Sequence, residues 1–217
     1  MELNDARLMN IQIIPDIGCL SAMEHYGSHI SHFVLDSLEA YFWMSNRYCV
    51  RPAAWDKDLF DKISNFGVEN FFEPVEAPEI LIIDRAPADG RHGATTRRIV
   101  NIDELAGAIR NHFGCSVNIM TFEGMTMSQQ LSLFRSAKMV VAQHGSVLGH
   151  TIWMRPEASG VVELVPPKFQ KEGWEYFSLL CSARKIPRVE IRQDSPFSPV
   201  PIDEVIDALQ KIKNLVD

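Results

Sequence analysis

The chain has 217 residues, of which 46% are hydrophobic and 23% charged, so it can bury the core of one domain or of two small lobes. Its formal net charge of −7 argues against a general nucleic-acid-binding protein, although a cleft in an acidic protein can still be locally basic. No apolar run approaches the roughly 20 residues that a membrane-spanning helix needs.

The cysteines are scattered, form no CxxC pair and lie in or beside apolar stretches: Cys19, Cys49, Cys115 and Cys181. This usage is typical of reduced thiols in a core. The N-terminus lacks the basic residues and long apolar run of a secretory signal. Together these features predict a cytoplasmic protein, unless the chain is a fragment of something larger.

The pattern changes near residue 75. Before that point we expect a strand at 8–14, a helix at 29–44, an amphipathic helix over 53–67 that ends at Gly67, and a proline-containing link at 71–79. We therefore divide the chain into a small N-terminal lobe, residues 1–75, and a second domain, residues 76–217.

In the second domain, buried strands alternate with helices of 10–13 residues. We expect strands at 79–84, 116–122, 138–143, 160–165 and 188–191, and helices at 103–113, 127–136, just after His144, at 173–184 and at 203–215. This alternation implies right-handed crossovers and a parallel, Rossmann-like sheet. Its ligand should lie beyond the carboxyl ends of the strands, near Asp84, the turn at 121–127, His144 and Glu163.

The sharpest motif is QHGSVLGH at 143–150, which follows a strand and opens a short helix. Gly145 lets the backbone approach a ligand, and the first amides of a helix suit a pyrophosphate. A plain turn in which His144 packs locally is the alternative. The motif is not a hydrolase elbow, because Ser146 is not centred between the glycines.

A cationic loop follows the first of these strands and contains Arg85, Arg91, His92, Arg97 and Arg98. Guanidinium groups match phosphate oxygens well, so this loop suggests phosphate recognition. The alternative is a solvated loop whose arginines pair with surface carboxylates.

Glu163 lies inside the apolar run VVELVPP. A buried carboxylate is costly unless it accepts hydrogen bonds, which the two hydroxyls of a ribose would supply. The alternative is a buried glutamate that pairs with an arginine.

His32 and Asp36 are four residues apart in the predicted early helix and therefore share a face. Either could take a proton from an acceptor hydroxyl. A zinc face of His25, His29, His32 and Asp36 has no evident further ligand, so we expect no metal there. A purely structural role for these residues is the other interpretation.

The sequence Asp56-Lys57-Asp58 imitates the DxD signature of manganese-dependent sugar transferases. In those enzymes the acids should follow a buried strand. Here they lie in a charged helical stretch, so a solvated helix face is the better interpretation.

Taken together these motifs resemble glycosyltransferase family 61, in order, over about residues 25–167. The matching segments are HFVLD at 32–36, the strand-terminal Arg85, RRIVN at 97–101 with the following DEL, Gln129 or Gln130 with SAKMVVAQ, His144-Gly145-Ser146, and Val162 to Pro166. The resemblance implies an inverting, metal-independent enzyme of GT-B architecture that uses a UDP-sugar. The second domain would be its Rossmann-like donor domain and the first 75 residues a reduced acceptor lobe.

The resemblance also implies roles for individual residues. Arg85, Arg97, Arg98 and the turn His144, Gly145, Ser146 and Val147 would hold the diphosphate, Glu163 the ribose, and Asp36 or His32 would face the acceptor. The sequence departs from the family pattern in two places. Ser146 replaces the usual alanine, and Leu148-Gly149-His150 replaces leucine-threonine-asparagine, so His150 would contact the donor in its own way.

We therefore expect an enzyme that transfers sugar from a UDP-sugar to a glycan or another hydroxyl acceptor, without a metal or other cofactor. Two alternatives stay open. One is a non-catalytic nucleotide-sugar-binding module of a larger glycosylation enzyme, and the other is a metal-dependent GT-A transferase built on Asp56 and Asp58.

Overall fold

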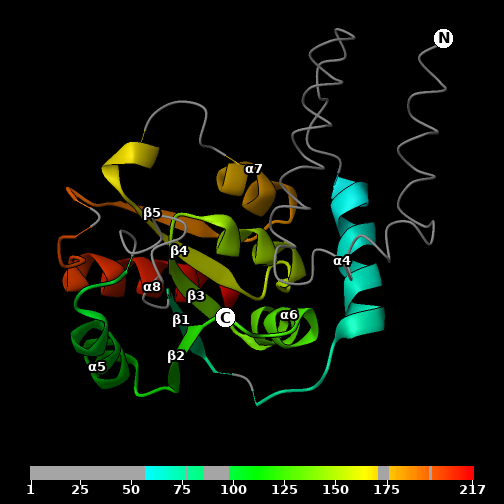
Figure 1. Cartoon of the computed structure of the whole chain (residues 1–217), viewed down its shortest axis with the longest axis horizontal. Coiled ribbons are helices and arrows are strands. Elements are labelled where there is room, and N and C mark those ends of the chain that lie inside the picture. The colour runs from blue at the N-terminus through cyan, green and yellow to red at the C-terminus, as the bar shows by residue number, and fades with distance from the viewer. Residues whose placement is uncertain (1–56, 77, 86–97, 171–175, 196) are drawn as a thin grey trace, which may run out of the picture.

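The computed structural model describes residues 57–76, 78–85, 98–170, 176–195 and 197–217. These residues form a five-stranded parallel sheet with helices on both faces (Figure 1). The strands are β1 (Ile80–Asp84), β2 (Val117–Thr121), β3 (Met139–Gln143), β4 (Gly160–Val165) and β5 (Arg188–Arg192). The helices are α4 (Lys57–Phe71), α5 (Ile102–Phe113), α6 (Met127–Ser136), α7 (Tyr176–Ala183) and α8 (Ile202–Val216), with short 3-10 helices η2 (Ser146–Trp153) and η3 (Pro167–Phe169).

The strand order is β2-β1-β3-β4-β5, and every neighbouring pair is parallel. This is one of the common orders of doubly wound sheets. The predicted α/β class and the alternation of strands and helices after residue 79 are therefore confirmed, and the parallel sheet is compatible with a Rossmann-like fold.

The core lies on both faces of the sheet, because successive residues of a strand point to opposite sides. In β1, Leu81 and Ile83 pack in the apolar layer that contains α4, α6, η2 and α7. Ile80 and Ile82 pack in the opposite layer, under α5 and α8. Figure 1 shows the two sets of helices on opposite sides of the strands.

Local sequence signals fix several helix ends. The αL conformation of Gly114, with φ of 62°, ends α5, and its N–H donates to the carbonyl of Arg110. Thr126 and Gln129 form a capping box at the start of α6, in which each side chain accepts a hydrogen bond from the other residue's N–H. Both ends lie where the sequence predicted them.

Helix α4 does not end at Gly67 as predicted but continues to Phe71. Gly67 is a packing residue, since a Cβ placed on it would lie 2.3 Å from an atom of the Trp153 ring. Trp153 is fully buried, so α4 can approach η2 this closely only without a side chain at position 67. A glycine that ends a helix and one that packs inside it look alike in sequence.

A buried cation also attaches α4 to the sheet domain. Arg184, just after α7, donates to the carboxylate of Asp61 and to the hydroxyl of Ser64, the latter at 3.0 Å. Burial lowers the pKa of Arg184, and the charge of Asp61 opposes that effect. Although α4 precedes residue 75, it shares the core of the residues that follow. The division at 75/76 remains a prediction for the lobe formed by residues before 57, which lie outside the described ranges.

Two further expectations concern the environment of the protein. Within the described ranges no helix is long and apolar enough to cross a membrane. Cys115 and Cys181 are free thiols, as expected, while Cys19 and Cys49 lie outside the described residues.

The packing of Gly67 is testable with a matched pair of glycine substitutions. Gly67→Ala should lower the free energy of unfolding by about 1–3 kcal/mol, because its methyl group overlaps the Trp153 ring. Gly107→Ala in α5 has no atom within 4 Å of the new Cβ and should instead stabilise by about 0.5–1 kcal/mol. Urea unfolding measures both, and equal effects would contradict the packing role.

Candidate functional site

The strand order reverses at the junction of β1 and β3. From β1 the chain passes through α5 to β2 on one side of β1, and then through α6 to β3 on the other. Ile83 of β1 pairs with Ala142 of β3, so the ends of these strands lie side by side. Ligands of doubly wound sheets bind in the crevice at such a switch point, beyond the carboxyl ends of the strands. Arg85 and His144 are the residues that leave the two strands there.

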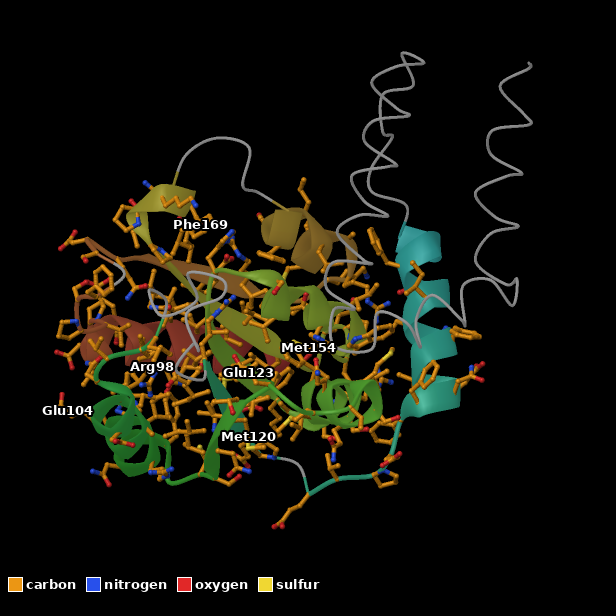
Figure 2. All side chains as sticks on the ribbon, in the orientation of Figure 1. Arg98, Glu104, Met120, Glu123, Met154 and Phe169 are labelled. Atoms are coloured by element: carbon orange, nitrogen blue, oxygen red, sulfur yellow. The ribbon has the colours of Figure 1, made fainter. Side chains whose placement is uncertain are left out.

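Arg98 also lies at this edge, where it is held by the last residue of β1. Nε and Nη2 of Arg98 donate to Oδ2 of Asp84 at 3.3 and 3.1 Å, and the N–H of Ile99 donates to Oδ1 at 3.2 Å. Asp84 is buried, whereas the Arg98 side chain is 46% exposed. Asp84 therefore fixes the direction of a guanidinium group that still faces solvent. In Figure 2 Arg98 lies on the side of the sheet away from α4.

Arg85 is half-buried beside an acidic neighbour. Burial lowers the pKa of Arg85, and the charge of Glu123, in the turn after β2, opposes part of that effect. The turn at 121–127, which the sequence selected as one of four ligand-facing places, thus supplies a carboxylate close to Arg85. Arg97 lies outside the described residues.

The turn after β3 is held by the neighbouring strand. The N–H of His144 donates to the carbonyl of Leu164 in β4 at 2.7 Å. Gly145 is the N-cap of η2, and the first bond of that helix runs from the N–H of Leu148 to the carbonyl of Gly145 at 2.9 Å. The amides of Ser146 and Val147 precede that bond, so they are the helix-start donors that the sequence predicted.

A buried carboxylate on β4 joins this turn to β5. Glu163 has no exposed surface; its Oε1 lies 2.5 Å from Nδ1 of His144, and its Oε2 accepts from Nε of Arg188 at 2.5 Å. Nη2 of Arg188 donates to Glu190 at 3.0 Å. Of the two interpretations of Glu163, the pair with an arginine is the one that the structure shows. Contact with a ribose stays a prediction.

Aromatic rings enclose the imidazole of His144. The Phe169 ring stacks on it with centroids 4.4 Å apart, and the Phe177 ring meets it edge-on at 5.1 Å. Phe169 belongs to η3, which directly follows β4 at the carboxyl edge of the sheet. His144 is thus a buried, oriented imidazole at the end of β3, with its ring plane fixed by packing and its Nδ1 by Glu163.

A glutamine pair completes the polar lining at this edge. Nε2 of Gln143 donates to Oε1 of Gln193 at 3.1 Å and to the carbonyl of Arg98 at 3.4 Å. Both side chains are buried, and in the described part of the chain Oε1 of Gln143 and Nε2 of Gln193 have no partner. Gln143, the last residue of β3, thus bonds both to Arg98, which is held at the end of β1, and to Gln193, which directly follows β5.

Comparison with known protein families matches residues 30–162, more than half of the chain, to the family described as Glycosyltransferase 61. The chain belongs to this family. No curated protein matches. Among solved structures, one match is to rubredoxin oxygen:oxidoreductase from the anaerobe Desulfovibrio gigas, with 13% identity and a TM-score of 0.40 over 63% of this chain and 35% of that one. A likeness this low carries no inference about function.

Three residues of the family motifs have structural contacts. Asn101, from RRIVN, exchanges two hydrogen bonds with the backbone of Val200, ahead of α8, at 3.1 and 2.9 Å. Gln130 is buried and its Nε2 donates to the carbonyl of Met125 at 2.9 Å, which holds the turn before α6. Gln129 belongs to the capping box. These motif positions therefore stabilise the scaffold around the edge.

Other predicted site residues cannot be placed. The candidates for the base, His32 and Asp36, lie outside the described residues, as does Asp56. Asp58 lies in the first turn of α4, within a helix as the sequence interpretation expected. Among the described residues no group of three or more histidine, cysteine or acidic side chains could hold a metal ion.

Sequence reasoning assigned no side-chain role to Asp84, Gln143, Gln193 or Arg188. The signal for Arg188 was available in RVEIR at 188–192, where polar and apolar residues alternate and place three charged side chains on one face of a strand. The partner of Glu163 could have been sought among those three residues.

His150, which the sequence proposed as a donor contact, is buried in the core. Its ring lies between Phe122 and Phe134, with centroid distances of 5.6 and 5.3 Å, and its Nδ1 has no hydrogen-bond partner in the described part of the chain. Burial lowers the pKa of His150 from 6.5 to about 3, so the ring is neutral at physiological pH. Contact with the donor stays a prediction.

The burial of His150 should make stability depend on pH. An unfolded imidazole takes up a proton near pH 6.5 while the folded one stays neutral to about pH 3, so falling pH stabilises the unfolded state relative to the folded one. His150 should therefore cost up to about 1.4 kcal/mol of stability for each pH unit below 6.5. Urea unfolding between pH 7 and 5 should show a shallower pH dependence for His150→Leu than for the wild type. Parallel curves would refute the assignment.

Proposed function

We propose that this glycosyltransferase is an inverting, metal-independent enzyme of GT-B type that transfers a sugar from a UDP-sugar to a hydroxyl group of a glycan. The observation that carries the proposal is that Arg85 and the turn before η2 directly follow the paired strands β1 and β3, with Arg98 bonded to the last residue of β1. Family membership supports transfer of a sugar, and this edge offers the kinds of donor that a nucleoside diphosphate accepts.

In the proposed reaction the oxygen of the acceptor hydroxyl attacks C1 of the sugar from the face opposite the diphosphate. A C1–O bond forms, the bond from C1 to the diphosphate oxygen breaks, and UDP departs with the bonding electrons. Asp36 or His32 takes the proton of the hydroxyl. Negative charge grows on the leaving diphosphate, so groups that stabilise it there lower the barrier.

Each described residue has a role in this scheme. Arg85 and Arg98, together with Arg97, bind the diphosphate through N–H groups. Gly145 allows close approach, and the amides of Ser146 and Val147 meet the same oxygens, which is why no divalent ion is required. Glu163 would act on the ribose only if it exchanged His144 or Arg188 for the donor, and His150 on the sugar only if its ring left its packing against Phe122 and Phe134.

The function itself is tested with a panel of nucleotide sugars in the presence of EDTA. Transfer, or slow hydrolysis of one UDP-sugar with inversion at C1, should be visible by NMR without added metal. UDP binding with neither transfer nor hydrolysis would favour the non-catalytic module. Activity that EDTA abolishes and manganese restores would favour the metal-dependent alternative with Asp56 and Asp58.

Two substitutions should separate binding from chemistry. Arg98→Gln keeps a donor for Asp84 but removes the charge, so it should weaken UDP binding about 10–100-fold and lower turnover as well. Asp36→Asn should leave UDP binding intact and abolish most turnover. Calorimetry with UDP and initial rates measure both effects.

Lys138→Gln is the matched control for Arg98→Gln. Lys138 is exposed and precedes β3, at the opposite edge of the sheet, so its loss removes the same charge without affecting the proposed site. If both variants lost UDP affinity equally, the effect of Arg98 would be explained by the overall charge of the protein and not by contact with the diphosphate. A near-normal rate for Asp36→Asn would show that Asp36 is not the base, which would leave His32 or water in that role.

A further inference from the structure

Three residues from three segments form a continuous chain of contacts: Arg188 on β5, Glu163 on β4 and His144 after β3. Each carboxylate oxygen of Glu163 has its own partner, Nδ1 of His144 on Oε1 and Nε of Arg188 on Oε2, both at 2.5 Å. Glu163 and His144 are buried, and the Arg188 side chain is 16% exposed. None of the motifs that resemble the family includes Arg188.

The chemistry of these atoms fixes the tautomer of His144. An ionised carboxylate can only accept hydrogen bonds, so Nδ1 must carry a proton toward Glu163. When the ring is neutral, Nε2 then carries no proton and is an acceptor. A diphosphate also only accepts, so an imidazole that bonds to it through Nε2 must carry protons on both nitrogens.

We propose that Arg188 is a positioning residue for this site: its guanidinium fork holds Glu163 so that Glu163 fixes His144 as the Nδ1–H tautomer, and the ring takes up a second proton on Nε2 when it binds the diphosphate of the donor. The role toward the diphosphate rests on the proposed function. The tautomer and the role of Arg188 rest on the contacts alone.

The surroundings of the ring support this arrangement. On β5, burial alone would raise the pKa of Glu190, but hydrogen bonds from Arg192 and Arg188 outweigh it and lower the pKa, so Glu190 is ionised. On α7, burial raises the pKa of the Cys181 thiol to about 12, so it carries no charge. Lys168 lies 5.6 Å from the centroid of Phe169, on η3.

Charged side chains of both signs lie near the contact between Glu163 and His144. Glu163 and Glu190 supply two negative charges, and Arg188 supplies one positive charge. Arg192 also contacts Glu190, but its side chain is 70% exposed and water screens much of its charge. Glu163 contacts the His144 ring directly, as a carboxylate contacts the imidazole in hydrolase triads.

The fork geometry is specific to arginine. Nε of Arg188 donates to Glu163 while Nη2 donates to Glu190 at 3.0 Å, so one planar group orients two carboxylates. A lysine ammonium is a point charge on a flexible stem and does not reproduce a planar fork. The proposal therefore predicts that even Arg188→Lys disturbs the ring of His144.

The test is a long-range proton–nitrogen NMR spectrum of the histidine side chains, recorded without and with UDP. The His144 signals are identified by their loss in His144→Gln. In the wild type, Nδ1 should appear protonated and Nε2 unprotonated, and both should appear protonated after UDP is added. In Arg188→Met and Arg188→Lys the free ring should show a mixture of tautomers.

Kinetics provide a second readout. Arg188→Met should lower kcat about tenfold or more, with a smaller change in KM, because the misplaced ring no longer meets the charge that develops on the diphosphate. Arg188→Lys should fall between this variant and the wild type. Arg192→Met is the matched control, since it removes an exposed arginine from the same strand, and it should match the wild type in spectrum and rate.

Each outcome decides one part of the proposal. Wild-type tautomers and rates in a folded Arg188→Met overturn it. If Arg188→Met does not fold, which thermal unfolding detects, a wild-type spectrum for Arg188→Lys overturns it instead. A ring that keeps one proton with UDP bound refutes the contact with the diphosphate. Because the spectra of the free protein need no turnover, absence of transferase activity would count against the proposed function and leave the role of Arg188 to be judged by those spectra.

Discussion

A carboxylate without any exposed surface lies in the middle of the sheet, and the arrangement of the carboxyl edge depends on it. The burial of Glu163 depends on its contacts with Arg188 and His144, because moving a lone carboxylate out of water costs far more than any single contact in the core returns. The contacts that stabilise it also tie three segments together at the end of the strands. Stability and the orientation of the site therefore depend on the same pair of oxygens.

The two edges of the sheet use buried charges for different purposes. At the carboxyl edge, Asp84 bonds to Arg98 and Glu163 contacts His144. Near the opposite edge, Arg184 follows α7 and bonds to Asp61 and to the carbonyl of Met154, which fastens α4 to the sheet domain. In Figure 2 Met154 lies toward α4 and Arg98 lies away from it. Helix α4 is thus fixed at a distance from the edge where a donor would bind.

Much of the sheet could be predicted from sequence, because its strands are short apolar runs and its helices carry clear caps such as Gly114 and Thr126. The positions of Arg85 and His144 at one edge followed from parallel alternation alone. What could not be predicted is which charges pair. From sequence, Glu163 was equally suited to accept hydrogen bonds from ribose hydroxyls and to pair with an arginine. Its arginine partner, Arg188, lies 25 residues farther along the chain, on the neighbouring strand. Gly67 was misread because local sequence does not show that Trp153 will pack against it.

The pairing of charges bears on how an acidic protein could stabilise a diphosphate. Arg85 has Glu123 as a neighbour, Arg98 bonds to Asp84, and Arg188 bonds to Glu163, so none of these arginines supplies an uncompensated positive charge. A diphosphate at this edge would therefore be held mainly by hydrogen bonds from oriented N–H groups. A strong net positive electrostatic field would contribute less. Donors fixed in advance lose little energy in reorganisation as charge develops, and they act over short range. This favours stabilisation of the departing diphosphate over long-range attraction of the donor, which a net charge of −7 would oppose in any case.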